Sequence, residues 1–208
     1  MRLKPYFLYI FSFFILLLMS GCIGGTSQQS VYYVLSPIDG IEGQPSSFSI
    51  CKLGVGPIKI PEFLNRPQIV SRHDENQLTI HEFHRWGDGL DTQITELMVE
   101  NFSNLLHSSN VSAYPWERHF EPTFQLYMDV RELGGNLKGP VTLTVAWQLI
   151  ESQSGLQVIS RRTKLEEDIS GEGVLAYVSA VNTLLNTFSQ QIAGEATQEL
   201  IKTCDSKQ

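Results

Sequence analysis

The sequence has 208 residues, with 15 Lys and Arg against 22 Asp and Glu, a formal net charge of −7 at pH 7. This length suffices for one domain with a hydrophobic core, and the acidic balance argues against nucleic acid as a ligand and against a basic patch for anionic headgroups. The composition therefore predicts a single globular domain that binds no nucleic acid.

The chain begins with a segment typical of a secretory signal. Two cations precede an uncharged apolar run at residues 6–19, which is shorter than the ~20 apolar residues of a membrane-spanning helix. Ser-Gly and then Cys22 end the run, which resembles the bacterial lipobox, although Met19 stands where Leu is usual. We expect residues 1–21 to be a lipoprotein signal peptide that is cleaved off and Cys22 to carry covalent lipid, such as palmitate. An uncleaved signal anchor is the alternative.

Residues 22–30 follow as a polar tether with Gly and Ser, which suits a flexible connection between lipid and domain. Several acyl chains, at ~0.8 kcal/mol per buried CH2, anchor a protein stably. Ile23 rather than Asp follows the cysteine, and by the sorting pattern of enterobacterial-type lipoproteins this resembles an outer-membrane address. Cleavage before Cys22 leaves 13 Lys and Arg against 22 Asp and Glu, a net charge of −9.

Two cysteines remain after cleavage, Cys51 and Cys204. Because an exported protein lies in an oxidising compartment, one disulfide between them is expected. It would close a loop of about 150 residues, worth ~5 kcal/mol in the chain-entropy model. Two separate thiols are the alternative. Neither cysteine belongs to a C-x-x-C motif, so no catalytic role is predicted for them.

The first part of the domain predicts strands separated by turns, because β-branched and aromatic runs alternate with Pro, Gly and Asn. Strands are expected at 31–36, at 48–60 with a break near 54–57, at 68–72 and at 77–83, the last two as a hairpin. Residues 88–107 predict an amphipathic helix, since their apolar positions recur with a period near 3.6. Asp88 or Asp91 is expected to cap the start of this helix, and a short strand follows at 111–114.

The second part predicts an antiparallel meander and a long helix. Apolar and polar residues alternate through expected strands at 124–131 and 141–149, with a third strand at 156–164. Residues 172–203 predict the helix.

Two amphipathic helices and about seven strands predict an α+β, or mixed α/β, fold. We expect a single domain over residues 31–204, with a mixed, mostly antiparallel sheet and both helices packed on one face. Residues 205–208 form a polar tail.

The densest polar and aromatic cluster is HEFHRWGDGLD at residues 81–91. A metal site would combine His81 and His84 with Glu82 or His73. If this segment is a strand, His81 and His84 point to opposite faces, which disfavours the site. No G-x-S-x-G, Walker or H-E-x-x-H motif occurs in the sequence. We therefore predict no enzyme, no metal and no cofactor beyond the covalent lipid.

Two interpretations of the cluster remain open. In the first, it is a strand-to-helix corner in which Trp86 packs and Arg85 pairs with a carboxylate. In the second, Arg85 and Trp86 bind a partner, since these residue types are enriched at interface hot spots.

Four stretches carry a resemblance to a known family: YYVLSP (32–37), IKIPEFLNRPQIVSR (58–72), HRWGDGLDTQI (84–94) and YPW (114–116). In this order they are similar to the ABC-type transport auxiliary lipoproteins, the PqiC or YmbA group. Phe63 stands where Tyr is common in that family, and Gly87-Asp88-Gly89 replaces the more usual Ala-Glu-Pro.

The resemblance implies a periplasm-facing lipoprotein of the outer membrane. Its partners would be a periplasm-spanning MCE-type protein, similar to PqiB, and an inner-membrane protein, in a system that moves lipids between the membranes. The lipoprotein would be a non-catalytic docking or structural component and a homo-oligomer, such as a ring. The strand at 141–150 would offer the small side chains of Thr142, Thr144 and Ala146 to a neighbour.

Two other functions compete with this one. A lipid-binding shuttle predicts a deep apolar pocket in the domain. An envelope enzyme predicts an activity that depends on His81, His84 or Asp88.

Overall fold

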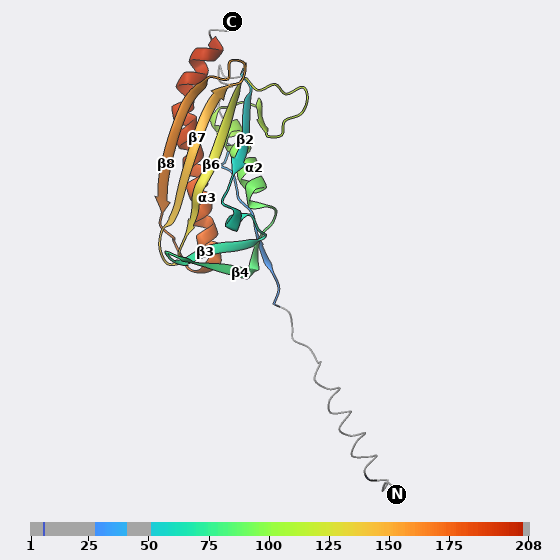
Figure 1. The fold of residues 1–208 in the computed structure, drawn as a ribbon, viewed down its shortest axis with the longest axis vertical. Helices are drawn as coiled ribbons and strands as arrows, with labels where there is room; N and C mark the ends of the chain where they lie inside the picture. The colour runs from blue at the N-terminus through green and yellow to red at the C-terminus, as the bar shows by residue number, and fades with distance from the viewer. Residues whose placement is uncertain (1–5, 7–27, 41–50, 206–208) are drawn as a thin grey trace.

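The computed structural model describes residue 6, residues 28–40 and residues 51–205, with side chains described as far as residue 197. Cys22, most of the expected signal peptide and the side chain of Cys204 lie outside the described residues. The described residues form a single α+β domain of two sheets and two long helices, as the sequence predicts (Figure 1).

The larger sheet has five strands in the order β5-β2-β6-β7-β8. Its strands are β2 (Leu53–Lys59), β5 (Val111–Ala113), β6 (Phe124–Gly135), β7 (Val141–Glu151) and β8 (Gln157–Glu167). The expected meander is confirmed, because β7 pairs antiparallel with both β6 and β8. β2 pairs parallel with both β5 and β6.

The smaller sheet has three strands in the order β1-β4-β3 and lies across one end of the larger one (Figure 1). β3 (Gln68–Asp74) and β4 (Gln77–Trp86) form the expected hairpin, and β1 (Val31–Tyr33) pairs parallel with β4. A short 3-10 helix, η3 (Glu62–Leu64), connects β2 to β3.

The expectation of one mostly antiparallel sheet is wrong, because three of the six strand pairings are parallel. Parallel neighbours need a long crossover, and here β2 is followed by a hairpin and a helix before β5 forms beside it.

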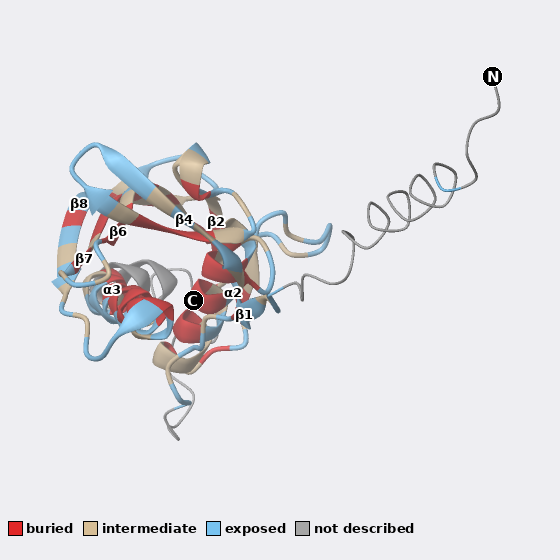
Figure 2. Ribbon diagram, turned by 90° about the horizontal axis from the view of Figure 1, so that it is seen from below, coloured by how far each residue is buried: buried red, intermediate tan, exposed pale blue. Residues whose placement is uncertain are grey.

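Both helices pack on one face of the larger sheet, as expected (Figure 1). They are α2 (Leu90–Leu105) and α3 (Gly173–Asp205). The core between helices and sheet contains large, fully buried side chains, among them Phe102, Phe124, Trp147 and Phe188, and Figure 2 shows these buried stretches in the interior. Each such side chain contributes ~1.5–3 kcal/mol through burial, so this layer supplies most of the stability.

The start of α2 differs from the expectation. Gly89 occupies the N-cap position, and no side chain caps the helix. The Asp88 carboxylate instead accepts from the Gly89 N–H at 2.7 Å, and the Asp91 carboxylate accepts from the Thr92 N–H at 2.9 Å. Asp91 lies in the first turn, where its negative charge interacts favourably with the helix dipole.

Residues 34–39, which we name the N-terminal strap, follow β1 outside either sheet. Side-chain amides of the two helices satisfy its backbone. Gln93, Asn182 and Asn101 accept from the N–H groups of residues 35, 36 and 38, and Asn186 and Asn104 donate to the carbonyls of residues 36 and 38. These bonds pin the strap to both helices, because its backbone groups have no sheet partner.

Replacing Asn101 with Ala should destabilise the domain. Asn101 is 0% exposed; its amide accepts from Ile38 N–H at 2.8 Å and donates to Asn186 Oδ1 at 2.8 Å and Ser189 Oγ at 2.9 Å. The variant leaves a buried donor unpaired, so the free energy of unfolding should fall by about 2–3 kcal/mol in urea titrations. The exposed helix position Gln190→Ala is the control, with an expected change within ~0.5 kcal/mol. Equal urea midpoints for both variants would contradict this role.

Candidate functional site

The corner between β4 and α2 joins four segments of the chain. The Trp86 N–H donates to the Pro67 carbonyl at 2.8 Å, and the Gly87 N–H donates to the Tyr33 carbonyl at 2.7 Å. A Cβ atom on residue 87 would lie 3.0 Å from Cγ1 of Val34, so a larger residue here would push against the strap. The corner therefore positions the N-terminal strap against the start of α2.

Trp86 lies in the core of this corner, with 5% of its surface exposed. Its burial favours the packing interpretation, because the indole offers a partner almost no surface. Arg85 is half-buried, and its Nε donates to the Glu82 carbonyl at 3.3 Å rather than pairing with a carboxylate. Of the two predicted partner-binding residues in the corner, Arg85 is therefore the one that a partner can reach.

Four polar and aromatic side chains meet where the three strands of the smaller sheet adjoin. The Tyr33 hydroxyl lies 2.8 Å from His84 Nδ1, and the Ser71 hydroxyl lies 2.8 Å from His81 Nε2. The two imidazole rings contact edge to face, with centroids 6.2 Å apart. Burial lowers the pKa of His81 below its ordinary value, and the nearby His84 lowers it further.

The expectation that His81 and His84 point to opposite faces is wrong. The pairing of β3 with β4 shifts between Gln68↔Arg85 and Ile69↔His81, so that four steps along β4 correspond to one step along β3. This irregularity resets the alternation and brings the rings together. Even so, no group of His, Cys, Asp or Glu in the described part of the chain has a metal-binding arrangement.

The face of the larger sheet away from the helices carries Thr142, Thr144 and Ala146. Thr142 and Ala146 are half-buried. Thr144 is buried, because its hydroxyl donates to the Glu132 carboxylate at 3.3 Å and Glu132 also pairs with Arg72 of β3 at 3.6 Å. The end of this face under β3 is thus covered, and the rest, which we name the open sheet face, is available to a partner (Figure 1).

The open sheet face is polar along its strands. Ion pairs join Arg131 to Asp129 on β6 at 2.7 Å and Lys164 to Glu166 on β8 at 2.7 Å. Polar residues alternate here with the apolar ones that face the helices, as expected for a sheet with one wet side. A polar protein surface fits this face better than an acyl chain does.

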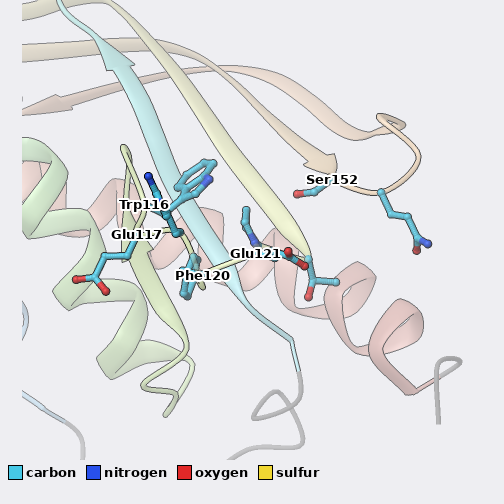
Figure 3. Close-up of a pocket in the computed structure, with 9 residues that line it drawn as sticks. Trp116, Glu117, Phe120, Glu121 and Ser152 are labelled. Atoms are coloured by element: carbon cyan, nitrogen blue, oxygen red, sulfur yellow. The ribbon is translucent and has the colours of Figure 1, made fainter.

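A hollow of about 700 Å3 lies beside the loop between β5 and β6 (Figure 3). Trp116, Glu117, Phe120 and Glu121 line it from the loop, and Ser152 lines it from the turn between β7 and β8. The hollow is lined by mixed charged and aromatic groups, without a nucleophile paired to a base among the lining residues. Sequence reasoning missed it, because its walls come from segments far apart in the chain.

The YPW segment packs at the base of this loop. The Tyr114 and Trp116 rings stack edge to face with centroids 5.1 Å apart, and a Cβ atom on Gly54 would lie 2.6 Å from Trp116. Gly54 is therefore required so that the indole can lie on the backbone of β2.

The cavity between the helices and the larger sheet is very small. It has a volume of about 10 Å3 and is lined by apolar side chains, among them Leu53, Leu126 and Leu149 of the sheet and Phe102, Ile192 and Ala196 of the helices. This volume holds one water molecule at most. This cavity is therefore too small for an acyl chain.

The sequence pattern of the ABC-type transport auxiliary lipoprotein component family matches residues 33–193. This range runs from the end of β1 to the last third of α3 and includes the corner and the open sheet face. The chain belongs to this family. A comparison with curated protein sequences gave no match.

Solved structures share the fold of this auxiliary lipoprotein component. A crystal structure of an uncharacterized protein is 22% identical, with a TM-score of 0.66, and the match covers 81% of this chain and 99% of that one. Protein XCC0632 from Xanthomonas campestris is 17% identical, with a TM-score of 0.70 over 86% of this chain and 100% of that one. At these identities the likeness establishes the fold alone.

The family places the chain among lipoprotein components of transport systems, consistent with a membrane-anchored envelope protein. Within the ranges that the structure describes, no helix has both the length and the hydropathy that a membrane crossing requires.

Cys51 of the auxiliary lipoprotein is buried and disulfide-bonded. Leu53, two residues further on, and Ala196 of α3 line the same small cavity, so the start of β2 lies beside the C-terminal part of α3. Cys204 follows Ala196 by about two helical turns. We therefore keep Cys204 as the proposed partner, although its side chain lies outside the described residues.

Replacing Cys204 with Ser should remove the disulfide and lower the free energy of unfolding by about 5 kcal/mol. The double variant Cys51→Ser, Cys204→Ser should lose no more free energy of unfolding than the less stable of the two single variants, because both substitutions remove the same bond. Urea unfolding measures the losses, and maleimide labelling of the unfolded, unreduced wild type should find neither thiol free. Labelling of both thiols without reductant would contradict the pairing.

Acidification should destabilise the domain partly through His81. The folded state lowers the pKa of His81 from 6.5, so the unfolded state binds the proton more tightly. His81 therefore contributes its full stability above about pH 6.5, and the contribution falls as pH drops through the lowered pKa. Between about pH 7.5 and about pH 5, the urea midpoint of His81→Gln should fall by less than that of the wild type. The midpoint of His119→Gln, a change at an exposed position, should fall by as much as that of the wild type. An unchanged loss in His81→Gln would contradict this assignment.

Proposed function

We propose that the protein is an outer-membrane lipoprotein that acts as a non-catalytic docking or structural component of an MCE-type intermembrane lipid transport system. The observation that carries the proposal is the family match over residues 33–193, which includes nearly all of the folded domain. The lipobox-like cysteine lies only nine residues before β1 and supports attachment to a membrane.

The anchor in this proposal is the lipid on Cys22, with the domain facing the periplasm. A tether of this length spans at most about 30 Å when fully extended. Anchoring therefore keeps the domain close to the membrane and raises its effective concentration for a periplasmic partner. The absence of Asp after Cys22 supports the outer membrane as the location.

A docking role is favoured over a lipid shuttle and over an enzyme. The described core has a cavity of only about 10 Å3, whereas a shuttle needs room for acyl chains. The two histidines of the corner bond to Tyr33 and Ser71, which serve packing between strands. Neither arrangement supports a catalytic centre.

The open sheet face and Arg85 are the proposed contact surfaces for the MCE-type, PqiB-like partner or for a second copy of the chain. Thr142 is half-buried, so part of its side chain is exposed on this side of the sheet, and the buried Thr144 two residues further on is bonded to Glu132. We also propose that the protein is a homo-oligomer, because a ring of copies would surround the end of a periplasm-spanning conduit symmetrically.

A bulky residue at Thr142 should disrupt docking without unfolding the domain. A photo-crosslinking residue at position 142 of the otherwise native protein in intact envelopes should capture an MCE-type protein or a second copy of the chain, identified by mass spectrometry. A second probe carries the photo-crosslinking residue at position 85. Adding Thr142→Trp to this second probe should reduce its capture of the same protein several-fold and leave the urea midpoint unchanged. Thr183→Trp, on the exposed side of α3, is the matched control. Equal capture in Thr142→Trp and Thr183→Trp would contradict the assigned face. Envelopes that yield no MCE-type protein from the probe at position 142 or the probe at position 85 would contradict the proposed function.

A further inference from the structure

Exposed apolar side chains gather on the smaller sheet. Ten large hydrophobic residues are exposed among the described ones, and six of them belong to β1, to β4 or to the residue that follows β1. These six are Val31, Tyr32, Val34, Leu78, Ile80 and Phe83. We name them the apolar end patch. Tyr32 is 64% exposed and Ile80 is 41% exposed, so these side chains take little part in the core.

The β1 part of the apolar end patch lies where the tether enters the domain, and Leu78 and Ile80 lie further along β4, toward its turn with β3. β1 is the first strand after the tether and pairs directly with β4, with Val31 opposite His84. The loop between β5 and β6, the turn between β7 and β8 and the end of α3 lie at the opposite end of the molecule (Figure 1). Figure 2 looks onto the end that carries the patch.

The charge of the smaller sheet also differs from that of the whole protein. Its three strands contain two Arg and two acidic residues, Arg72 and Arg85 against Asp74 and Glu82, with Glu75 in the hairpin turn. The whole chain carries −7, so nearly all of the negative charge lies elsewhere. The smaller sheet is therefore close to neutral, and its own strands add little electrostatic repulsion at an anionic bilayer surface.

We propose that the apolar end patch rests on the lipid surface to which the protein is anchored. The proposal builds on the lipid anchor of the proposed function. Eight residues separate Cys22 from β1, so an anchored domain cannot move the patch more than about 30 Å from the bilayer. Exposed Tyr, Phe and aliphatic residues favour the boundary between headgroups and acyl chains. Contact there orients the domain so that the open sheet face stands roughly perpendicular to the membrane. The loop between β5 and β6 then points away from the membrane.

Fluorescence quenching by nitroxide-labelled lipid tests this orientation. The full, natively processed protein is reconstituted into vesicles of equal parts phosphatidylethanolamine and phosphatidylglycerol with a nitroxide-labelled lipid. An environment-sensitive dye is attached at Ile80→Cys or Tyr32→Cys, with Leu156→Cys as the control, because Leu156 is 64% exposed at the opposite end. Quenching should be several-fold stronger at positions 80 and 32 than at position 156. Ile80→Glu should reduce the quenching at position 32.

The outcomes separate this proposal from the anchor itself. Flotation of the labelled protein with the vesicles reports the anchor. Flotation with equal quenching at all three positions overturns the membrane contact and leaves the anchor standing. A blue-shifted but unquenched dye at position 80 also overturns it, since a protein surface would then cover the patch. Loss of flotation together with loss of quenching overturns both proposals.

Discussion

The burial of one face of the five-stranded sheet under α2 and α3 is the constraint on which the other features depend. Large side chains such as Phe102, Phe188 and Trp147 fill this layer, and the Trp147 indole N–H donates to the Thr163 hydroxyl at 3.1 Å. The inward positions of the sheet are therefore mostly apolar, with Thr163 paired to the Trp147 indole, and the alternating positions between them face away from the helices. The same alternation that builds the core thus creates a polar sheet face that no helix covers.

The N-terminal strap connects this core to the end of the molecule that carries β1 and the smaller sheet. Amide groups of both helices hold its backbone, with Asn101 completely buried at the centre. A pull on the tether would therefore reach the helices through several hydrogen bonds rather than through the three residues of β1 alone. The smaller sheet lies at the same end, so in the proposed orientation the strap and the apolar end patch would link the lipid surface to the core.

Periodic patterns predicted most of the fold, because strands and helices are local features. Each expected strand and helix within the described residues is present, with boundaries that differ by a few residues. The parallel pairings could not be predicted in the same way, since residues far apart in the sequence form them. The irregularity that brings His81 to His84 and the amides that hold the strap arise from the same kind of long-range contact.

The candidate site was predictable only in part for the same reason. The sequence indicated Arg85 and Trp86 as candidates for packing or for partner binding, but only the folded corner shows that Trp86 is buried. Thr142 and Thr144 alternate identically along β7, yet a register shift after Val130 of β6 brings Glu132 over Thr144. A bulge on a neighbouring strand leaves no pattern in the sequence of β7.

Attachment of the domain to a membrane, as proposed, requires that the mature chain begin at a lipid-bearing cysteine. Mass spectrometry of the amino-terminal peptide, taken from protein purified out of its native envelope, measures this directly. The peptide should begin at Cys22 and carry the mass of its acyl chains. A peptide that still contains residues 1–21, or one that begins at Cys22 without acyl chains, would contradict the account.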